Sequence, residues 1–286
     1  MNKIGKLYIC GTPLGNLEDI SFRAIKTLKE VDLVAAEDTR RTVKLLNYYD
    51  ISTPLTSYHE HNEEKKSEEL INKLEEGQKI ALVSDAGMPG ISDPGLILIQ
   101  KVIDRGFKVI PVPGPTAAVS ALVVSGFDTD RFVFEGFLPR RGKTREERLK
   151  DIKNEKRTII IYESPHRLKK TLRDLHTYIP ERRIALIREL TKVYEEKMYG
   201  TPSELLEEAT KRKIKGELVI VIEGGVKENQ TGRDFGSLSV VDHIKMLMDK
   251  GYTKKKAIKE VSRVRGLPKK EVYKKAVVIK ARPEKR

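Results

Sequence analysis

Short apolar runs alternate with helix-like stretches over most of the first 225 residues of this chain. An apolar run of four to six residues bounded by turn residues predicts a buried strand. Apolar positions at helical spacing, as in the stretch from the capping residue Ser21 to Glu30, predict helices between the strands. The predicted strands lie at 6–10, 31–36, 80–83, 108–112, 158–162, 183–188, 195–199 and 217–222. Strands that alternate with helices indicate the α/β class.

Changes in composition divide the chain into two α/β domains and a small helical module. We predict an N-terminal α/β domain over 1–125 and a second over 126–226. Residues 227–238 are rich in Gly, Asn, Gln and Ser and are predicted to be a linker. The remaining segment, 239–286, contains three short helical patterns separated by Gly251 and Gly266, which is typical of a helix-turn-helix-like module.

Three loops rich in Gly and Pro each follow a predicted strand, at 11–19, 84–95 and 113–117. Small side chains and fixed backbone angles allow a ligand to approach the main chain closely. If the strands are parallel, the three loops meet at one edge of the sheet, where α/β proteins bind ligands. The first loop lacks the glycine spacing of nicotinamide sites and the Gly-Lys-Ser/Thr of ATP sites. Ordinary strand-to-helix connections are the alternative interpretation.

Polar clusters follow two further strands. Residues 37–41 (Glu-Asp-Thr-Arg-Arg) either orient a polar ligand or cap a helix and carry surface charge, and 163–167 (Glu-Ser-Pro-His-Arg) form a similar group. His59 and His61 flank Glu60, a spacing that suits an ion, but a polar loop is favoured because no third remote ligand is evident. We therefore assign no metal. A single cysteine, Cys10, excludes an internal disulfide and fits a reducing compartment.

The net charge of +14 is concentrated in the last part of the chain, where residues 231–286 hold 17 Lys and Arg against 6 Asp and Glu. A basic block of this kind favours binding to nucleic acid, since phosphate contacts release counterions. A solvated lysine-rich surface is the alternative. The candidate phosphate contacts lie in the predicted third helix and in a predicted mobile loop: Lys269, Lys270 and Lys274, and Arg140, Arg141, Lys143 and Arg145.

No apolar stretch reaches the ~18 residues of a membrane span, and the first residues do not resemble a signal peptide. We therefore expect a soluble cytoplasmic protein with no membrane partner.

The motifs at 11–17, 36–40, 84–95, 112–117 and 162–167 together resemble the ribosomal RNA small subunit methyltransferase I family, a branch of the tetrapyrrole methylase superfamily. The resemblance implies two α/β domains of tetrapyrrole methylase type with S-adenosylmethionine in the cleft between them, in a homodimer. It also implies methyl transfer to the ribose 2′-hydroxyl of a cytidine in the decoding region of 16S rRNA in the small ribosomal subunit. The implied cofactor residues are Thr12, Pro13, Asp85, Met88, Thr116, Ala117 and Tyr162.

Methyl transfer from a sulfonium needs no metal, but a protonated ribose hydroxyl is a poor nucleophile and a base is expected. Glu163 and His166 are the candidates because they share one strand-end loop, and Asp85 is the next. Each of them has a structural role or a role in cofactor binding as its alternative.

Two other functions stay open. A methyltransferase that acts on a small tetrapyrrole would explain the loops but would leave the basic C-terminal segment without a use. A non-catalytic RNA-binding protein would explain that segment but not the three ligand loops.

Overall fold

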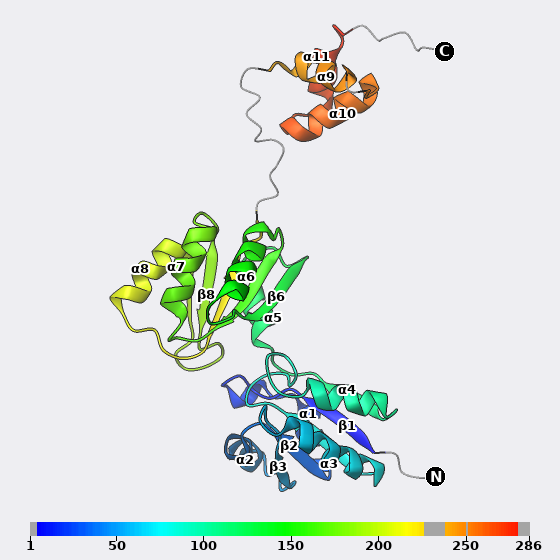
Figure 1. Cartoon of the computed structure of the whole chain (residues 1–286), viewed down its shortest axis with the longest axis vertical. Coiled ribbons are helices and arrows are strands. Elements are labelled where there is room, and N and C mark those ends of the chain that lie inside the picture. The colour runs from blue at the N-terminus through cyan, green and yellow to red at the C-terminus, as the bar shows by residue number, and fades with distance from the viewer. Residues whose placement is uncertain (1–4, 226–237, 250, 280–286) are drawn as a thin grey trace. The chain divides into compact units, whose positions relative to one another are not determined.

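The computed structural model describes residues 5–225, 238–249 and 251–279. Residue contacts divide the chain into two compact units, residues 1–225 and 226–286. Among the described residues, the first unit holds two β-sheets and the second holds three helices (Figure 1). The predicted linker at 227–238 lies outside the described residues, except for Leu238.

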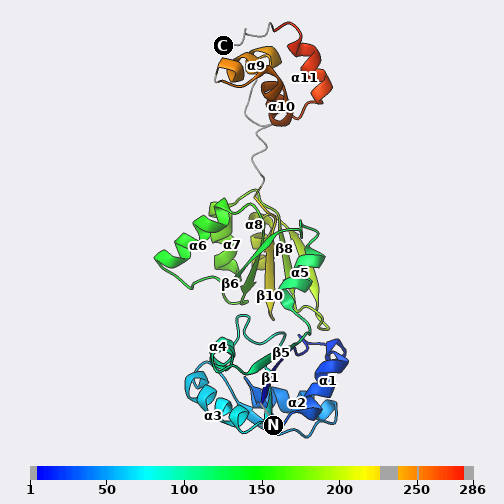
Figure 2. The ribbon, with the colours of Figure 1, turned by 90° about the vertical axis from the view of Figure 1, so that its right-hand side faces the viewer.

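The first sheet is parallel throughout, with the strand order β3-β2-β4-β1-β5. Its helices cover both faces, with α3 and α4 on one side and α1 on the other (Figure 2). The strands are β1 (Lys6–Cys10), β2 (Leu33–Ala36), β3 (Leu55–Ser57), β4 (Lys79–Val83) and β5 (Lys108–Val112). The helices are α1 (Phe22–Glu30), α2 (Thr39–Tyr48), α3 (Glu63–Glu75) and α4 (Leu96–Asp104), with a short 3-10 turn at Leu17–Asp19.

The parallel arrangement confirms the predicted convergence of the Gly/Pro loops. Strands β1, β4 and β5 are adjacent and parallel, so the loops that follow Cys10, Val83 and Val112 leave the sheet at the same edge. Two of them touch: a Cβ added to Gly11 would lie 2.7 Å from the Cα of Gly114. Glycine is required at both positions because any side chain would separate the two loops.

The second sheet is mixed, with the order β6-β7-β10-β8-β9. Strands β6 and β7 are parallel and all other neighbours are antiparallel. The strands are β6 (Phe132–Phe137), β7 (Thr158–Glu163), β8 (Ile184–Arg188), β9 (Glu196–Gly200) and β10 (Leu218–Ile222). Helices α6 (Lys143–Asn154), α7 (Leu168–Tyr178) and α8 (Pro202–Lys211) pack on one face.

Helix α5 (Ala117–Ser125) packs on the other face of the second sheet, although it follows the last strand of the first. Its Ala121 and Leu122 are buried against Ile160 and Val221 of that sheet. By its packing, helix α5 thus joins the second sheet, although it lies within the residues 1–125 that were predicted to form the first domain. Its apolar residues lie on every face, so periodicity alone did not show which sheet would receive it.

Helix α6 is a second difference from the sequence prediction. Residues 140–148 were expected to form a mobile basic loop, but a regular helix starts at Lys143 after Gly142, whose φ is 84°. Leu149 and Ile152 bury its inner face. The apolar signal was sparse because only every third or fourth residue of this helix meets the core.

Local sequence explains where several of the helices begin. Ser21 accepts a hydrogen bond from the N–H of Ala24 at the start of α1, as the sequence predicted. Thr201 and Glu204 form a capping box at α8, with Pro202 in the first turn. Such caps satisfy N–H groups that have no partner within the helix.

The C-terminal unit contains α9 (Val240–Asp249), α10 (Lys254–Arg265) and α11 (Lys269–Ala276). The three helices pack around Ile244, Ile258, Val261 and Val272, all of them buried. This arrangement confirms the three predicted helices. None of the described helices is long and apolar enough to cross a membrane.

Candidate functional site

A cavity of about 470 Å³ opens within residues 1–225. One wall is formed by the loop 84–95, by the residue that follows β2 and by the first turn of α2. The other wall is the edge of the second sheet at β6, β7 and β10. The N-terminus of α5 lies between them. Pockets of this size hold small molecules and nucleotide-like ligands.

The loop 84–95 is held in shape by contacts with the loop that follows β1. Thr12 and Gly87 exchange backbone hydrogen bonds at 2.9 and 3.0 Å, and the buried hydroxyl of Thr12 donates to the carbonyl of Ser84 at 3.1 Å. Gly87 has a φ of 85°, in the left-handed region that favours glycine. Ser92 has a φ of 62°, a conformation that costs a serine free energy. The loop is therefore rigid where it meets the cavity.

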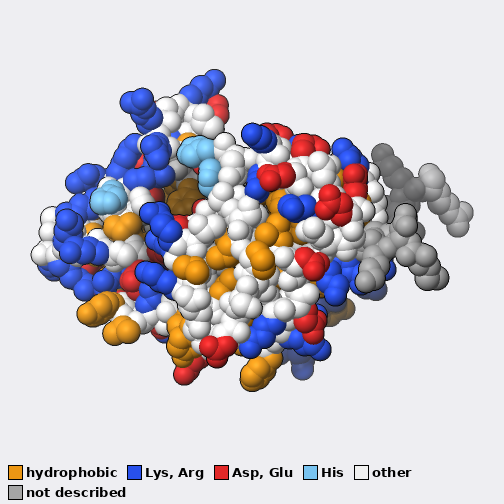
Figure 3. Space-filling model, turned by 90° about the horizontal axis from the view of Figure 1, so that it is seen from below, with side chains coloured by type: hydrophobic (Ala, Val, Ile, Leu, Met, Phe, Trp, Pro, Cys, Tyr) orange, Lys and Arg blue, Asp and Glu red, His pale blue; other side chains and the backbone are white. Residues whose placement is uncertain are grey.

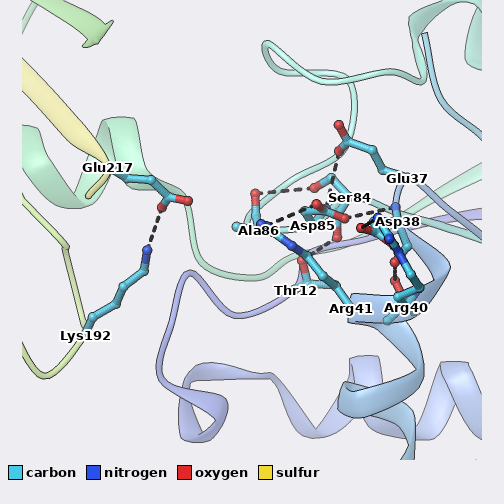
Figure 4. A network of polar contacts seen from close by, with 11 residues as sticks. Thr12, Glu37, Asp38, Arg40, Arg41, Ser84, Asp85, Ala86, Lys192 and Glu217 are labelled. Carbon is cyan, nitrogen blue, oxygen red and sulfur yellow. Dashed lines mark hydrogen bonds and ion pairs between the residues drawn. The ribbon is translucent and has the colours of Figure 1, made fainter. Parts of the chain in front are cut away.

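Asp85 connects this loop to the end of β2 (Figure 4). Its Oδ1 accepts the N–H of Asp38 at 3.0 Å, and its Oδ2 lies 3.2 Å from Nη1 of Arg41. Glu37 accepts the N–H of Asp85 at 3.5 Å. Asp38 caps α2, with a side chain that accepts the N–H of Arg40. The cluster at 37–41 therefore both caps a helix and lines the cavity, through Glu37 and Arg41.

Two carboxyl groups of the cavity are shifted toward their neutral form. Burial and the nearby charge of Glu37 raise the pKa of Asp93 to about 7. Burial and the charge of Asp85 raise the pKa of Glu37 as well. Carboxyl groups whose pKa is raised inside a cavity are typical of functional sites.

The opposite wall is aromatic. The ring of Tyr162 packs edge-on against Phe134 and Phe137, with ring centres 4.9 and 5.7 Å apart. Strand β6 has a bulge between Phe134 and Gly136, which allows both phenylalanines to line the cavity. The hydroxyl of Tyr162 accepts the N–H of Ala118 at 3.1 Å and fixes the first turn of α5.

The N-terminus of α5 faces the same space. Thr116 is its N-cap residue but makes no side-chain cap bond, and Thr116, Ala117 and Ala118 line the cavity. The small side chains leave room, and the positive end of the helix dipole favours a carboxylate or polar atom there.

The structure brings together five of the seven predicted cofactor residues: Asp85, Met88, Thr116, Ala117 and Tyr162. Thr12 and Pro13 are not part of the cavity lining. The hydroxyl of Thr12 instead donates to carbonyl oxygens of the loop 84–95, those of Ser84 and Gly87.

The two predicted catalytic residues are poorly placed for a base. The carboxylate of Glu163 is fully buried, accepts hydrogen bonds from Thr171 and from the N–H of Ser164, and lies 3.3 Å from Nε of Arg167. These contacts fasten α7 to β7 and occupy both oxygens. His166 is exposed and does not line the cavity. The structural alternative therefore fits Glu163 better than catalysis.

The predicted phosphate-binding residues divide into exposed and buried side chains. Arg140, Arg141 and Lys143 are exposed. Arg145 is 3% exposed, and its guanidinium donates to Asp174, Thr171 and the carbonyl of Pro139 at 2.8 to 2.9 Å. Arg145 thus holds α6 to α7, and its burial keeps its guanidinium away from a phosphate at the surface. Lys269, Lys270 and Lys274 of α11 are all exposed.

The histidine loop is explained by local contacts. The N–H of His59 donates to the side-chain oxygen of Asn62 at 2.9 Å, and the rings of His59 and His61 lie edge to face. Among the described residues, no three His, Cys, Asp or Glu side chains gather in a way that could hold a metal ion.

Several cavity residues were missed from the sequence. Asp93, Phe134, Phe137 and Glu217 all line the cavity. Asp93 lies within the loop that the sequence singled out, but nothing in the pattern separates it from Asp85. The phenylalanines and Glu217 come from distant strands, so only the fold places them here.

The chain matches known proteins over most of its length. The family described as Tetrapyrrole (Corrin/Porphyrin) Methylases matches residues 6–207. A protein of Halalkalibacterium halodurans named ribosomal RNA small subunit methyltransferase I is 52% identical over 270 residues, covering 94% of this chain and 93% of the relative. The protein of the same name from Bacillus subtilis is 47% identical over 272 residues, with 94% and 93% covered.

Solved structures show the same fold at low identity. A cobalt precorrin-4 methyltransferase matches with a TM-score of 0.59 and 21% identity, covering 76% of this chain and 94% of that one. A uroporphyrin-III C-methyltransferase from Thermus thermophilus, solved as a complex with S-adenosylhomocysteine, matches with a TM-score of 0.57 and 17% identity, covering 77% and 97%. The chain therefore belongs to the tetrapyrrole methylase family and, within it, to the ribosomal RNA small subunit methyltransferase I group.

Proposed function

We propose that this protein transfers the methyl group of S-adenosylmethionine to the ribose 2′-hydroxyl of a cytidine in the decoding region of 16S rRNA. That it is a methyltransferase of small-subunit ribosomal RNA follows from its close relatives, which carry that name at 47 to 52% identity over nearly the whole chain. The cytidine, the 2′-oxygen and the decoding region are our extension. The observation that carries the proposal is one cavity that is lined by residues of all three Gly/Pro loops, by the N-terminus of α5 and by the aromatic strands β6 and β7.

The residues of the cavity fit S-adenosylmethionine. The volume of about 470 Å³ suits a ligand of its size. Apolar and aromatic side chains, among them Met88, Phe134 and Tyr162, suit the adenosyl group. The carboxylates of Glu37 and Asp85 suit the positive charge of the sulfonium and the amino group, while the N-terminus of α5 and Arg41 suit the carboxylate. When bound, the cofactor supplies an electrophilic methyl group.

The chain's own residues position the reactants and exclude water. The rigid loop 84–95 and the Tyr162–Ala118 hydrogen bond hold the two walls of the cavity, so an acceptor oxygen can be presented in line with the methyl carbon. Positioning of this kind supplies a large part of the rate increase of methyl transfer.

Exposed basic residues are proposed to hold the rRNA. Arg140, Arg141 and Lys143 lie near the start of α6, and Lys269, Lys270 and Lys274 lie on α11. Figure 3 shows one face of the molecule, on which Lys and Arg side chains border a hollow with hydrophobic side chains at its floor. Phosphate contacts fix the register of the RNA, while the cavity selects the reacting ribose.

We also propose a homodimer in the cytoplasm, where small ribosomal subunits are assembled. Exposed apolar side chains support the dimer, because Val119 and Val123 of α5 and Tyr199 of β9 are 48%, 67% and 49% exposed. Light scattering on the purified protein tests the mass directly. A mass of one chain at micromolar concentration would contradict the dimer.

Cofactor binding by an Asp85 variant tests the site. Asp85→Ala removes the acceptor for the Asp38 N–H and the partner of Arg41, so the loop 84–95 loses its tie to β2 and α2. We expect calorimetry to show S-adenosylmethionine binding at least about 10-fold weaker, since lost charge-assisted bonds cost about 1.5–3 kcal/mol. Asp130→Ala, which removes an exposed carboxylate elsewhere, is the control. Unchanged binding by folded Asp85→Ala would contradict the site.

A further inference from the structure

The acids that line the cavity differ in what they bind. Asp85 pairs with Arg41, and Glu217 pairs with Nζ of Lys192 at 3.0 Å, on opposite sides of the cavity (Figure 4). Glu163 has both oxygens engaged by Thr171, Ser164 and Arg167. Each of these three carboxylates is neutralised by a cation within 3.3 Å.

Asp93 stands apart from them. Among the described residues it forms no ion pair, and the group that stabilises its charged form is the hydroxyl of Ser84. The charged groups that face it are carboxylates from three elements: Glu37 at the end of β2, Asp85 in its own loop, and Glu217 at the start of β10. A proton on Asp93 is therefore stabilised by its neighbours.

The backbone around Asp93 is fixed. Ser92 before it is left-handed, and Pro94 after it has a restricted φ. Gly95 has a φ of 141°, and a Cβ there would lie 2.9 Å from Leu82. On the other side, a Cβ on Gly136 of β6 would lie 3.3 Å from the hydroxyl of Ser92. The loop thus presents Asp93 to the cavity at the point where it meets the bulge of the aromatic wall.

We propose that Asp93 is the general base that takes the proton of the acceptor hydroxyl during methyl transfer. This inference rests on the proposed function. The hydroxyl oxygen forms a bond to the methyl carbon as the carbon–sulfur bond breaks, and the electron pair of that bond stays on sulfur. The proton leaves the oxygen for a carboxylate oxygen of Asp93, which later releases it to water. The reaction needs no other reactant.

The surroundings of Asp93 suit this role. A base is most effective when its pKa lies near the working pH, because it is then both available and strong enough. Burial beside Glu37 raises the pKa of Asp93 to about 7. Of the other four acids of the cavity, Asp85, Glu163 and Glu217 are paired with cations. The pKa of Glu37 is also raised by burial, but Glu37 accepts the N–H of Asp85 and faces the charge of Arg41, and both stabilise its charged form.

Single-turnover kinetics of the full-length protein test the proposal. The enzyme is saturated with methyl-labelled S-adenosylmethionine and mixed with unmethylated small ribosomal subunits over a range of about pH 5.5 to 9. We expect the wild-type rate to rise through an apparent pKa near 7 and then level off. Asp93→Asn is expected to lose about 100-fold or more in rate, together with the pH step, while its affinity for S-adenosylmethionine changes less than about 3-fold. Asp130→Asn is the matched carboxylate-to-amide control.

Other outcomes would overturn the proposal. A wild-type rate in Asp93→Asn would exclude Asp93 as the base. A parallel loss of rate and of cofactor affinity would make it a cofactor ligand. If the methyl-transfer rate of Asp93→Asn were reduced but still rose with pH as in the wild-type protein, Asp93 would be a positioning residue.

A measurement without substrate separates this proposal from the proposed function. Carbon-13 NMR titration of the aspartate carboxyls, with Asp93→Asn used for assignment, reports the pKa of Asp93 in the wild-type protein. We expect a value near 7, and a value near about 4, as in an exposed aspartate, would overturn the proposal whatever the substrate proves to be. Failure of the wild-type protein to label RNA would instead overturn the proposed function.

Discussion

The phenolic oxygen of Tyr162 accepts a hydrogen bond from the backbone N–H of Ala118 at 3.1 Å. This bond joins β7 to the first turn of α5, so the aromatic wall and the helix N-terminus of the cavity are held as one piece. Two segments that are 44 residues apart in sequence thereby build one side of the proposed cofactor site.

Tyr162→Phe removes this acceptor and leaves the ring in place. We expect the free energy of unfolding to fall by about 1 kcal/mol, because a part-buried N–H loses its partner. Affinity for S-adenosylmethionine should fall about 3- to 10-fold, since the first turn of α5 is no longer fixed. Thermal unfolding and calorimetry measure the two effects. Tyr178→Phe, on α7 and outside the cavity lining, is the control.

Arg145 and Arg141 lie four residues apart but should behave differently. Arg145→Met leaves Asp174 without its guanidinium partner beneath α6, and removal of one member of a buried pair costs about 3 kcal/mol or more. Thermal unfolding should show a midpoint lower by at least about 5 °C. Arg141→Met, at an exposed position, should shift it by less than about 1 °C. Equal midpoints for both variants would contradict the structural role of Arg145.

Sequence patterns predicted much of this fold because strands and helices of an α/β protein have distinct periodicities. The strands before the loops at Gly11, Ser84 and Pro113 were predicted, and their convergence followed from parallel pairing. The placement of α5 was not predictable in this way. A helix that is apolar on every face fits either sheet, and only the packing of Leu122 on the second sheet decides.

The site was predicted less completely than the fold. The role of a charged residue in a basic stretch or a polar cluster depends on the residues that it contacts in the folded protein. Arg145 finds Asp174 and Glu163 finds Thr171 on the neighbouring helix α7, and neither partner can be inferred from spacing. Asp93 lacks the cation that Asp85 has, and this difference is a property of the folded cavity.

The raised pKa of Asp93 predicts a dependence of stability on pH. The folded protein keeps a proton on Asp93 up to about pH 7, whereas the unfolded chain releases it near pH 3.9. Between these values the folded state binds more protons, so the contribution of Asp93 to stability decreases as the pH rises. Asp93→Asn should therefore raise the unfolding midpoint at pH 8 by about 2 °C or more, and should have little effect near pH 4. If the unfolding midpoint of Asp93→Asn at pH 8 were lower than that of the wild-type protein, the claim that neighbouring carboxylates destabilise a charged Asp93 would be contradicted.

The lysines of α11 should contribute to rRNA affinity through charge. Simultaneous replacement of Lys269, Lys270 and Lys274 by Gln should reduce the slope of log affinity against log salt by about 2 to 3. Cofactor affinity should not change. The control replaces three exposed lysines of the first domain by Gln, so that it loses the same charge: Lys26, Lys44 and Lys65. If the slope of log affinity against log salt in the α11 variant equalled that of the wild-type protein, these side chains would be excluded as phosphate contacts.

Methyl transfer from labelled S-adenosylmethionine is the measurement on which the proposed function depends. The purified protein is given unmethylated small ribosomal subunits, naked 16S rRNA and a tetrapyrrole precursor in parallel, and the labelled RNA is digested to nucleosides. We predict label in 2′-O-methylcytidine from the rRNA and none in the tetrapyrrole. Label on a base, or in the tetrapyrrole alone, would contradict ribose methylation, and absence of transfer despite RNA binding would contradict an enzymatic role.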